Sequence, residues 1–382
     1  MRRPFAALVA AAVVVASGWS EAEPAGARQP VGVFSPIGGE APILARLAPG
    51  SLRPGRLRLR LGEYHEDWSF SPDGSQLALG MGGQGDPCGR GICIVDAGTM
   101  RIAGYVHASI AVEAVAWLRP RRIVGVLQRG GVFVADPVTE TIVHSRNLPF
   151  QPFGPAVART SEGLAVLMRS RPPQLVVVNA HGDVRSVSLR RIERGAALAA
   201  APRGLRAFVT SAGGPVAEVN VRTMGVRYHG VATPHDGERR EALWLGDGML
   251  AVSGDPNAGV TVIDTRTWTA RTVAPGATSA RLAGGRLLVY SERFRPRSRG
   301  IGLRVYTRDG RRLVRHLFGD RHLEVEVLGE GVAVFRPDEF RARATEIVRA
   351  RTGVILRTVA RPPRGHEVSI LSSPLGSSEL PR

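Results

Sequence analysis

Residues 67–80 read Asp-Trp-Ser-Phe-Ser-Pro-Asp-Gly-Ser-Gln-Leu-Ala-Leu-Gly, a pattern typical of a strand, a tight turn and a second strand. The alternating run Trp68-Ser69-Phe70 precedes the turn, and the apolar run Leu77-Ala78-Leu79 follows it. Between them, proline fixes its own φ and glycine tolerates φ > 0, as a chain reversal requires. Weaker copies of this stretch recur about every 43 residues along the chain, which indicates an internal repeat.

The first repeated landmark is this strand–turn–strand signal. Its anchor residues are separated by 38 to 47 positions and are Phe70, Trp117, Val157, Ala200, Trp244, Leu282, Val327 and Ile370. The reversal is expected to be made by different residues in some copies, such as Gly246-Asp247-Gly248 and Ala283-Gly284-Gly285. The signal therefore marks two paired strands, A and B, in each repeat.

The second landmark is an apolar strand that ends in a polar turn. Its copies lie at Ile94–Thr99, Val134–Thr139, Val177–Asn179, Val219–Thr223 and Val262–Thr267, with degenerate copies at Tyr306–Gly310 and Val348–Gly353. Asp or Asn ends the strand in the five clear copies, because these side chains can hydrogen-bond their own turn backbone. This landmark joins two further strands, C and D, so each repeat has four short strands.

Four-stranded antiparallel repeats of this length are typical of a β-propeller, whose blades stand around a central channel. Residues 323–328 match residues 366–371 as two A strands, so the C-terminal part begins an eighth blade. The N-terminal part supplies its B, C and D strands at Val31–Phe34, Ile43–Leu47 and Arg56–Leu61. The sequence predicts an all-β fold of eight four-stranded blades, one closed by both termini; the alternative is seven blades with extra edge strands.

One stretch conflicts with a fold made only of strands. Residues 338–350 carry apolar side chains at a helical spacing, with acidic residues at the start. The repeat register instead places Glu346–Arg349 in a C strand, and we give the register precedence. A single helical turn near 338–341 is compatible with both.

The segment Trp68–Gly80 resembles the repeats of bacterial WD40-like, TolB-type and YVTN-type β-propellers. Phe70-Ser71-Pro72-Asp73-Gly74 matches the family motif in full, and Ala201-Pro202-Arg203-Gly204 matches it in part. The resemblance implies a propeller over nearly the whole chain. Proteins of this type include scaffolds, sensor domains and enzymes, so the resemblance implies no reaction.

The N-terminal 22 residues have the features of a signal peptide. Arg2 and Arg3 precede a twelve-residue apolar run, and small residues at Ser20 and Ala22 offer a cleavage site. Twelve residues are too few to cross a bilayer, which needs about 20. We therefore expect export of a soluble, secreted or extracytoplasmic protein with a linker at 23–30, a propeller at 31–372 and a flexible tail at 373–382.

The two cysteines, Cys88 and Cys93, lie between two strand runs and flank a four-residue loop. A reversal there can bring their Cα atoms within the range of a disulfide, about 4.4–6.8 Å. A metal site is the alternative, but no second thiol pair or nearby histidine completes one. The sequence predicts a local disulfide, which on the chain-entropy model stabilises by about 2 kcal/mol.

The formal net charge is +18, and all the basic residues are arginines. Arginine suits planar anions, which it binds through paired hydrogen bonds. The alternative is that genomic base composition replaces lysine throughout and leaves only a solvated basic surface. For an exported protein, anionic cell-wall polymers or membrane surfaces are favoured over nucleic acid as partners.

The densest group of basic residues lies in the B–C loops, which are long and variable and therefore suited to binding. Two neighbouring blades place seven arginines there: Arg293, Arg295, Arg297, Arg299, Arg336, Arg341 and Arg343. Together these guanidinium groups could hold a polyanion. The alternative is a solvated, arginine-rich loop without a ligand.

Histidines in the D–A loops are the other candidates. They are expected at one mouth of the channel, beside several carboxylates, and are His65, His107, His235 and His322. A metal or acid–base site there would make the protein a hydrolase or lyase. No HExxH or GxSxG motif occurs, and we predict no cofactor and no metal. The sequence favours a monomeric binding or scaffold module, with an anionic polymer or a protein as its partner.

Overall fold

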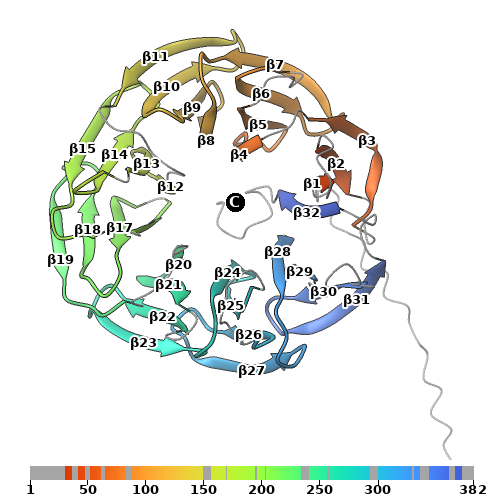
Figure 1. Cartoon of the computed structure of the whole chain (residues 1–382), viewed down its shortest axis with the longest axis vertical. Helices are drawn as coiled ribbons and strands as arrows, with labels where there is room; N and C mark the ends of the chain where they lie inside the picture. Colours follow the sequence, from red (N-terminus) through yellow and green to blue (C-terminus); the bar gives the residue numbers. More distant parts are fainter. Residues whose placement is uncertain are drawn as a thin grey trace, which may run out of the picture.

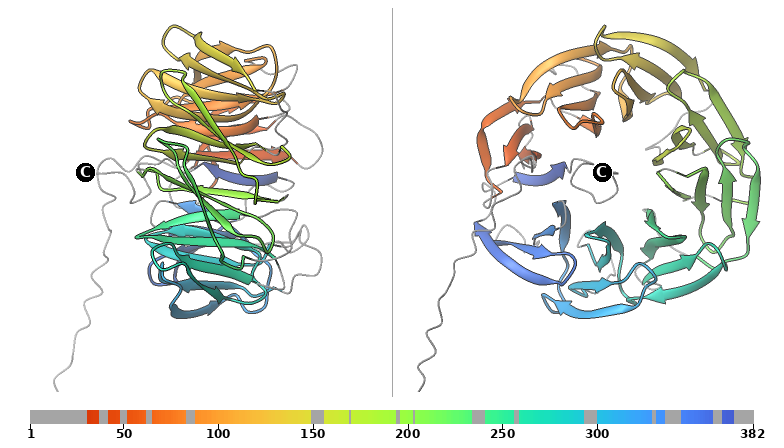
Figure 2. Two further views of the ribbon diagram at one scale, coloured as in Figure 1. Left: turned by 90° about the vertical axis from the view of Figure 1, so that its left-hand side faces the viewer. Right: turned by 180° about the vertical axis from the view of Figure 1, so that it is seen from behind.

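The computed structural model describes residues 31–36, 42–47, 52–61, 65–82, 88–148, 156–168, 170–193, 196–202, 204–233, 241–255, 259–292, 300–328, 331–335, 344–360 and 366–371. In these ranges, 32 strands form eight four-stranded antiparallel sheets. The sheets stand around a common centre as the blades of a propeller (Figure 1). Seen edge-on, they make a disc (Figure 2). The prediction of a β-propeller is confirmed.

Each blade runs from an inner A strand to an outer D strand (Figure 1). Blade 1 contains β4 (His65–Phe70), β5 (Gln76–Met81), β6 (Gly91–Asp96) and β7 (Arg101–His107). Blade 2 contains β8 (Val112–Arg119), β9 (Arg122–Leu127), β10 (Gly131–Asp136) and β11 (Thr141–Asn147). Blade 3 contains β12 (Ala156–Thr160), β13 (Gly163–Met168), β14 (Gln174–Val178) and β15 (Val184–Ser188). Blade 4 contains β16 (Ala197–Ala200), β17 (Arg206–Thr210), β18 (Val216–Asn220) and β19 (Val226–His229).

The second half of the ring repeats this order. Blade 5 contains β20 (Glu241–Gly246), β21 (Met249–Asp255), β22 (Gly259–Asp264) and β23 (Thr269–Val273). Blade 6 contains β24 (Ser279–Ala283), β25 (Arg286–Tyr290), β26 (Leu303–Tyr306) and β27 (Arg312–Leu317). Blade 7 contains β28 (Glu324–Leu328), β29 (Gly331–Phe335), β30 (Ala344–Arg349) and β31 (Val354–Ala360). All eight anchor residues of the first landmark lie in A strands, the last of them in β32 (His366–Leu371).

The remaining sheet joins the two ends of the described chain. Strand β32 pairs with β1 (Val31–Pro36), in a register that runs from Val31 opposite Leu371 to Pro36 opposite His366. Strands β2 (Ile43–Leu47) and β3 (Pro54–Arg60) complete this blade 8. The predicted closure by both ends is therefore present. Pairing also covers two strand edges that would otherwise be open to other chains.

The turns form through the local chemistry that the sequence indicates. Gly74 has a φ of 65°, and its amide donates to the carbonyl oxygen of Ser71 at 2.7 Å. In the second landmark, the side-chain oxygen of Asp96 accepts hydrogen bonds from the amides of Gly98 and Thr99, at 2.9 and 2.7 Å. The same turn recurs at Asp136, Asn179, Asn220 and Asp264. Asp and Asn thus supply the acceptors that the tight C–D turns need.

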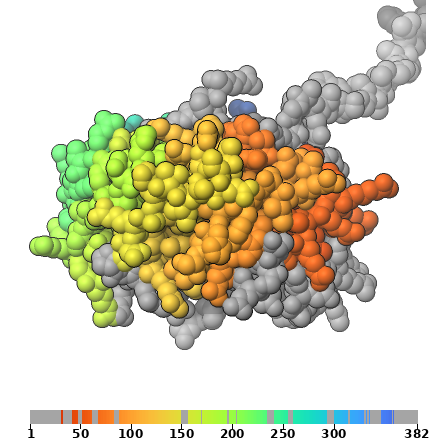
Figure 3. All heavy atoms as spheres, turned by 90° about the horizontal axis from the view of Figure 1, so that it is seen from above, coloured from red at the N-terminus to blue at the C-terminus, as the bar shows by residue number. Residues whose placement is uncertain are grey.

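The core lies between neighbouring blades. One buried cluster packs Phe70 of blade 1 against Leu44 of blade 8, and the next packs Ile94 of blade 1 against Trp117 of blade 2. Phe70 and Trp117 are at most 3% exposed, so both aromatic side chains pack in the core. Each sheet therefore depends on the next one for burial, and consecutive repeats lie side by side along the rim (Figure 3).

The stretch with helical spacing contains a strand. Strand β30 covers Ala344–Arg349, so the repeat register is correct for Glu346–Arg349. Apolar side chains are buried there because β30 is a C strand with a partner on each side, β29 and β31. The helical turn proposed near 338–341 lies outside the described residues. Within the described ranges, no helix has the length and apolarity that a membrane span needs.

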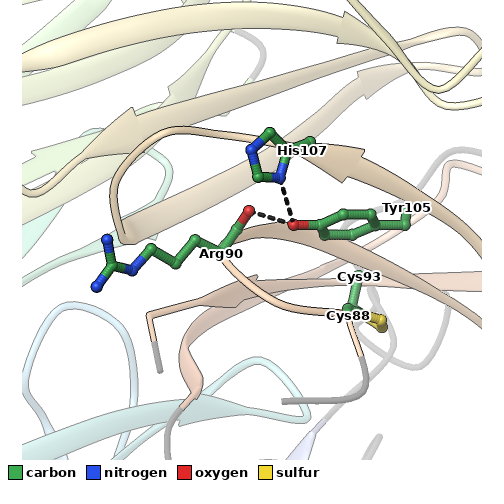
Figure 4. The surroundings of a disulfide bond; sticks show 5 residues. All are labelled: Cys88, Arg90, Cys93, Tyr105 and His107. Atoms are coloured by element: carbon green, nitrogen blue, oxygen red, sulfur yellow. Dashed lines mark hydrogen bonds between the residues drawn. A yellow bond between two sulfur atoms is a disulfide. The ribbon is translucent and has the colours of Figure 1, made fainter. Parts of the chain in front are cut away.

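Cys88 and Cys93 form a disulfide, with their Cα atoms 5.5 Å apart. This confirms the predicted local link. Figure 4 shows Tyr105 beside the disulfide, where its hydroxyl donates to the carbonyl oxygen of Arg90 and lies 3.1 Å from Nδ1 of His107. Cys88 is 5% exposed and Cys93 is fully buried, so the link belongs to the core of blade 1.

Candidate anion-binding pocket

One face of the disc is made by the A–B and C–D turns. Adjacent strands in each blade are antiparallel, so these two turns come to the same edge of the sheet, and the D–A and B–C connections come to the opposite edge. We call the first surface the turn face. The cavity described below lies on this face.

Two very short A–B turns frame this cavity. Gly246 pairs with Met249 across the two-residue turn Asp247–Gly248, and Ala283 pairs with Arg286 across Gly284–Gly285. All four turn residues have positive φ, between 52° and 80°. That combination defines a type I′ hairpin turn, which matches the twist of the flanking strands and strongly favours glycine. The sequence correctly indicated reversals at both places.

The cavity has a volume of about 530 Å³ and extends over blades 5, 6 and 7. It is lined by Asp247, Met249, Arg266, Gly284, Gly285, Arg286, Arg308, Asp309 and Arg351. Four guanidinium groups therefore face two carboxylates, a formal excess of two positive charges. The volume falls within the range of small-molecule sites, about 300–1,000 Å³. The lining is polar, so an ionic ligand suits it better than an apolar one.

Arg308 is held in place by a neighbouring blade. Its Nη1 lies 3.2 Å from Oδ2 of Asp247, on the A–B turn of blade 5. The guanidinium group packs against Gly246, where an added Cβ would lie 2.6 Å from the same nitrogen. Glycine thus provides the space that this arginine occupies, and Arg308 reaches from blade 6 onto blade 5.

Arg266 is partly neutralised within its own turn. Its Nε lies 3.3 Å from Oδ1 of Asp264. Hydrogen bonds from the Arg266 side chain and backbone lower the pKa of Asp264, so this carboxyl is ionised at neutral pH. Asp309 behaves similarly, because a hydrogen bond from the Thr307 hydroxyl lowers its pKa although partial burial opposes the shift.

Arg286 and Arg351 are different from these two arginines. Neither makes an ion pair with another described residue, and Nε of Arg286 is buried without a hydrogen-bond partner among those residues. Arg286 begins β25 beneath the turn, and Arg351 lies exposed on the C–D turn of blade 7. A guanidinium group in this position can bind an oxyanion through paired hydrogen bonds. The cavity can therefore accept at least one anionic group.

None of the candidate site residues named from the sequence is among those that line the cavity. The seven B–C loop arginines (293, 295, 297, 299, 336, 341 and 343) and His235 fall outside the described residues. His65 is the first residue of β4, and His322 is half-buried in the D–A connection between β27 and β28. His107 ends β7, the outer strand of blade 1 (Figure 1), so it lies at the rim and not at the channel.

Two carboxylate or hydroxyl side chains near the hub support the fold directly. Oδ2 of Asp67 accepts a hydrogen bond from the amide of Val115 at 3.0 Å, and Oγ of Ser69 accepts one from Trp117 at 2.9 Å. These contacts connect the inner strands of blades 1 and 2, β4 and β8.

Among the residues that the structure describes, no group of three or more His, Cys, Asp or Glu side chains could hold a metal ion.

The cavity arginines were not identified as a site from the sequence, although a signal was present. Arginine occupies the C–D turn in four consecutive blades, at positions 222, 266, 308 and 351, with spacings of 42 to 44 residues. A repeated charged residue at one turn position places a row of like side chains on one face.

Comparisons with known proteins address the fold. No protein-family model matches the chain, and no curated protein matches it in sequence. Among solved structures, dihydro-heme d1 dehydrogenase NirN is similar with a TM-score of 0.61 and 12% identity, over 91% of this chain and 75% of that one. Apo AztD from Citrobacter koseri is similar with a TM-score of 0.59 and 10% identity, over 90% and 99%. The Dos1 propeller is similar with a TM-score of 0.56 and 12% identity, over 79% and 85%.

Identities of 10–12% show the fold and nothing finer. These neighbours are β-propellers, and they cover most of the described chain. The full match of Phe70–Gly74 to the repeat motif agrees with this likeness. The chain therefore folds as a β-propeller.

Proposed function

We propose that this protein is an extracytoplasmic binding or scaffold module whose turn face engages an anionic polymer or a protein partner. The observation that carries the proposal is the cavity lined by Arg266, Arg286, Arg308 and Arg351. Its net positive lining matches the positive charge of the whole chain. Long-range attraction would bring an anionic partner to this protein, and the cavity would orient it.

The disulfide supports an extracytoplasmic location. Such bonds form and persist in oxidising compartments and are rare in the cytosol. Residues 1–30 lie outside the described residues. The proposal of an extracytoplasmic location includes a signal peptide at 1–22 and a linker at 23–30. We also propose that the protein acts as a monomer, and that the B–C loop arginines provide a second basic surface on the opposite face.

The test is retention of the folded protein on immobilised dextran sulfate, eluted with rising salt. One variant replaces three turn-face arginines with glutamine: Arg266→Gln, Arg308→Gln and Arg351→Gln. A matched control makes the same charge change on exposed rim strands: Arg58→Gln, Arg101→Gln and Arg146→Gln. We expect the turn-face variant to elute at clearly lower salt than the control. With fewer arginines in contact with the polyanion, binding releases fewer counterions and is therefore weaker. Equal shifts would attribute retention to net charge alone and would overturn the proposal.

A further inference from the structure

Arginine–carboxylate pairs between blades recur on the turn face. Arg222, on the C–D turn of blade 4, lies 2.9 Å from Glu162, on the two-residue A–B turn of blade 3. Arg308, on the C–D turn of blade 6, lies 3.2 Å from Asp247, on the two-residue A–B turn of blade 5. The partners are 60 and 61 residues apart in sequence. We call this contact between successive blades the turn clasp.

The turn clasp is incomplete between blades 6 and 7. Arg351 occupies the C–D turn of blade 7, but the A–B turn of blade 6 is Gly284–Gly285, which has no side chain. Gly284 corresponds to Asp247, since each is the first residue of its two-residue turn and their φ values are 53° and 52°. The backbone is therefore set up as in blade 5, while the carboxylate is missing.

The missing carboxylate coincides with the cavity. Arg351, Gly284 and Gly285 all line it, and Arg351 pairs with no other described residue. A second observation concerns Arg286, whose buried Nε has no hydrogen-bond partner among the described residues. Arg286 also lines the cavity and makes no ion pair with another described residue, so an anion there would meet a guanidinium group that no neighbouring carboxylate neutralises.

We infer that the cavity receives a carboxylate side chain from an acidic segment of a protein partner, in the place of the missing turn acid. This inference rests on the proposed function and narrows it to one site and one ligand chemistry. A carboxylate is favoured because both complete clasps use one. A volume of about 530 Å³ accommodates one or two side chains of a protruding segment. Arg351 and Arg286 then bind the carboxylate, and Arg308 stays with Asp247.

The experiment uses the full chain and a C-terminally amidated hexaglutamate peptide as the probe, with hexaglutamine as the uncharged control. Gly284→Asp supplies the missing acid from within, and Asp247 shows that aspartate is accepted at this backbone conformation. Gly284→Asn adds a side chain of the same shape without charge. We expect Gly284→Asp and Arg351→Gln each to raise the Kd for hexaglutamate at least tenfold, and Gly284→Asn to change it less than threefold.

Formation of the internal clasp is checked without any ligand. In Gly284→Asp, the pKa of the new carboxyl, followed by carbon NMR, should lie below the usual aspartate value and should return toward it when Arg351→Gln is added. Equal melting temperatures of the variants show that all of them fold. If that pKa stays at the usual aspartate value, Arg351 does not reach the turn and the inference is wrong.

The outcomes separate the two proposals. Hexaglutamate affinity that is unchanged in Gly284→Asp, or lowered equally in Gly284→Asn, contradicts the carboxylate site. If hexaglutamate does not bind while dextran sulfate retention still depends on the turn-face arginines, the proposed function stands and this inference fails. If neither ligand responds to those arginines, both fail.

Discussion

Glu162 is held by arginines from two blades. Nη2 of Arg185, in blade 3, lies 3.0 Å from Oε2, and Nη2 of Arg222, in blade 4, lies 2.9 Å from Oε1. The hydrogen bonds from these two side chains lower the pKa of Glu162, although desolvation opposes the shift. The carboxylate of Glu162 therefore links blades 3 and 4 at the surface and also pairs within its own blade.

The lowered pKa predicts a pH dependence of stability. Because the folded-state pKa of Glu162 is below its usual value of 4.5, its contribution is present above that value and is lost as pH falls through the folded pKa. Glu162→Gln should therefore destabilise the protein near pH 6 and have less effect near pH 3.5. Urea unfolding at both pH values measures the difference. The control is Glu193→Gln, at an exposed position outside this pair; an equal pH trend in the two variants would contradict the assignment.

The sequence indicates residue roles where the partners are local. Asp96 and Asn220 accept hydrogen bonds from amides two or three positions later, so the turn pattern alone predicts their contacts. Glu162 and Arg222 are 60 residues apart, and only the blade arrangement brings them together. Gly284 could be recognised as a turn residue, but its missing carboxylate becomes visible only beside Asp247.

At the scale of elements, the repeated strands and turns were predictable and the loops were not. A period of about 43 residues identifies all eight A strands, because each copy carries the same apolar pattern and turn chemistry. His107 shows where this reasoning fell short. The repeat pattern predicts His107 in a D–A loop at the mouth of the channel. A D–A loop begins at the outer strand of a blade, however, and His107 is the last residue of that outer strand, β7.

The blade 6 B–C loop gives a prediction for the opposite face. Replacing Arg293, Arg295, Arg297 and Arg299 together by glutamine should lower the salt concentration at which the protein elutes from a heparin-type column, because four cationic contacts are removed. Combining these changes with the turn-face triple should lower it further if the two faces bind independently. An unchanged elution profile would show that this loop is only a solvated basic segment.

At the scale of the molecule, stability depends on closing the ring. Blades bury their apolar faces against each other, and the last contact is made by β32 next to β1. The sequence predicts this closure because residues 323–328 and 366–371 match as two copies of one strand. The location of the cavity could not be predicted from the sequence, because the cavity is lined by side chains from three blades.

Removing the closing strand tests this dependence. A chain that ends at Pro363 lacks β32, so blade 8 loses its inner strand and exposes the edge of β1. We expect a clear drop in melting temperature and a broader transition by calorimetry. A chain that ends at Ser372, without the predicted tail, is the control and should melt like the full-length protein. Similar melting of all three chains would mean that blade 8 adds little to the ring.

The pairing of β1 with β32 has a consequence for biosynthesis. A ribosome makes Val31 long before His366, so the two halves of one blade are produced at opposite ends of translation. During elongation β1 can pair with β2, but its other edge lacks a partner until β32 has been made. Final assembly of blade 8 therefore has to wait until the last strand has been made.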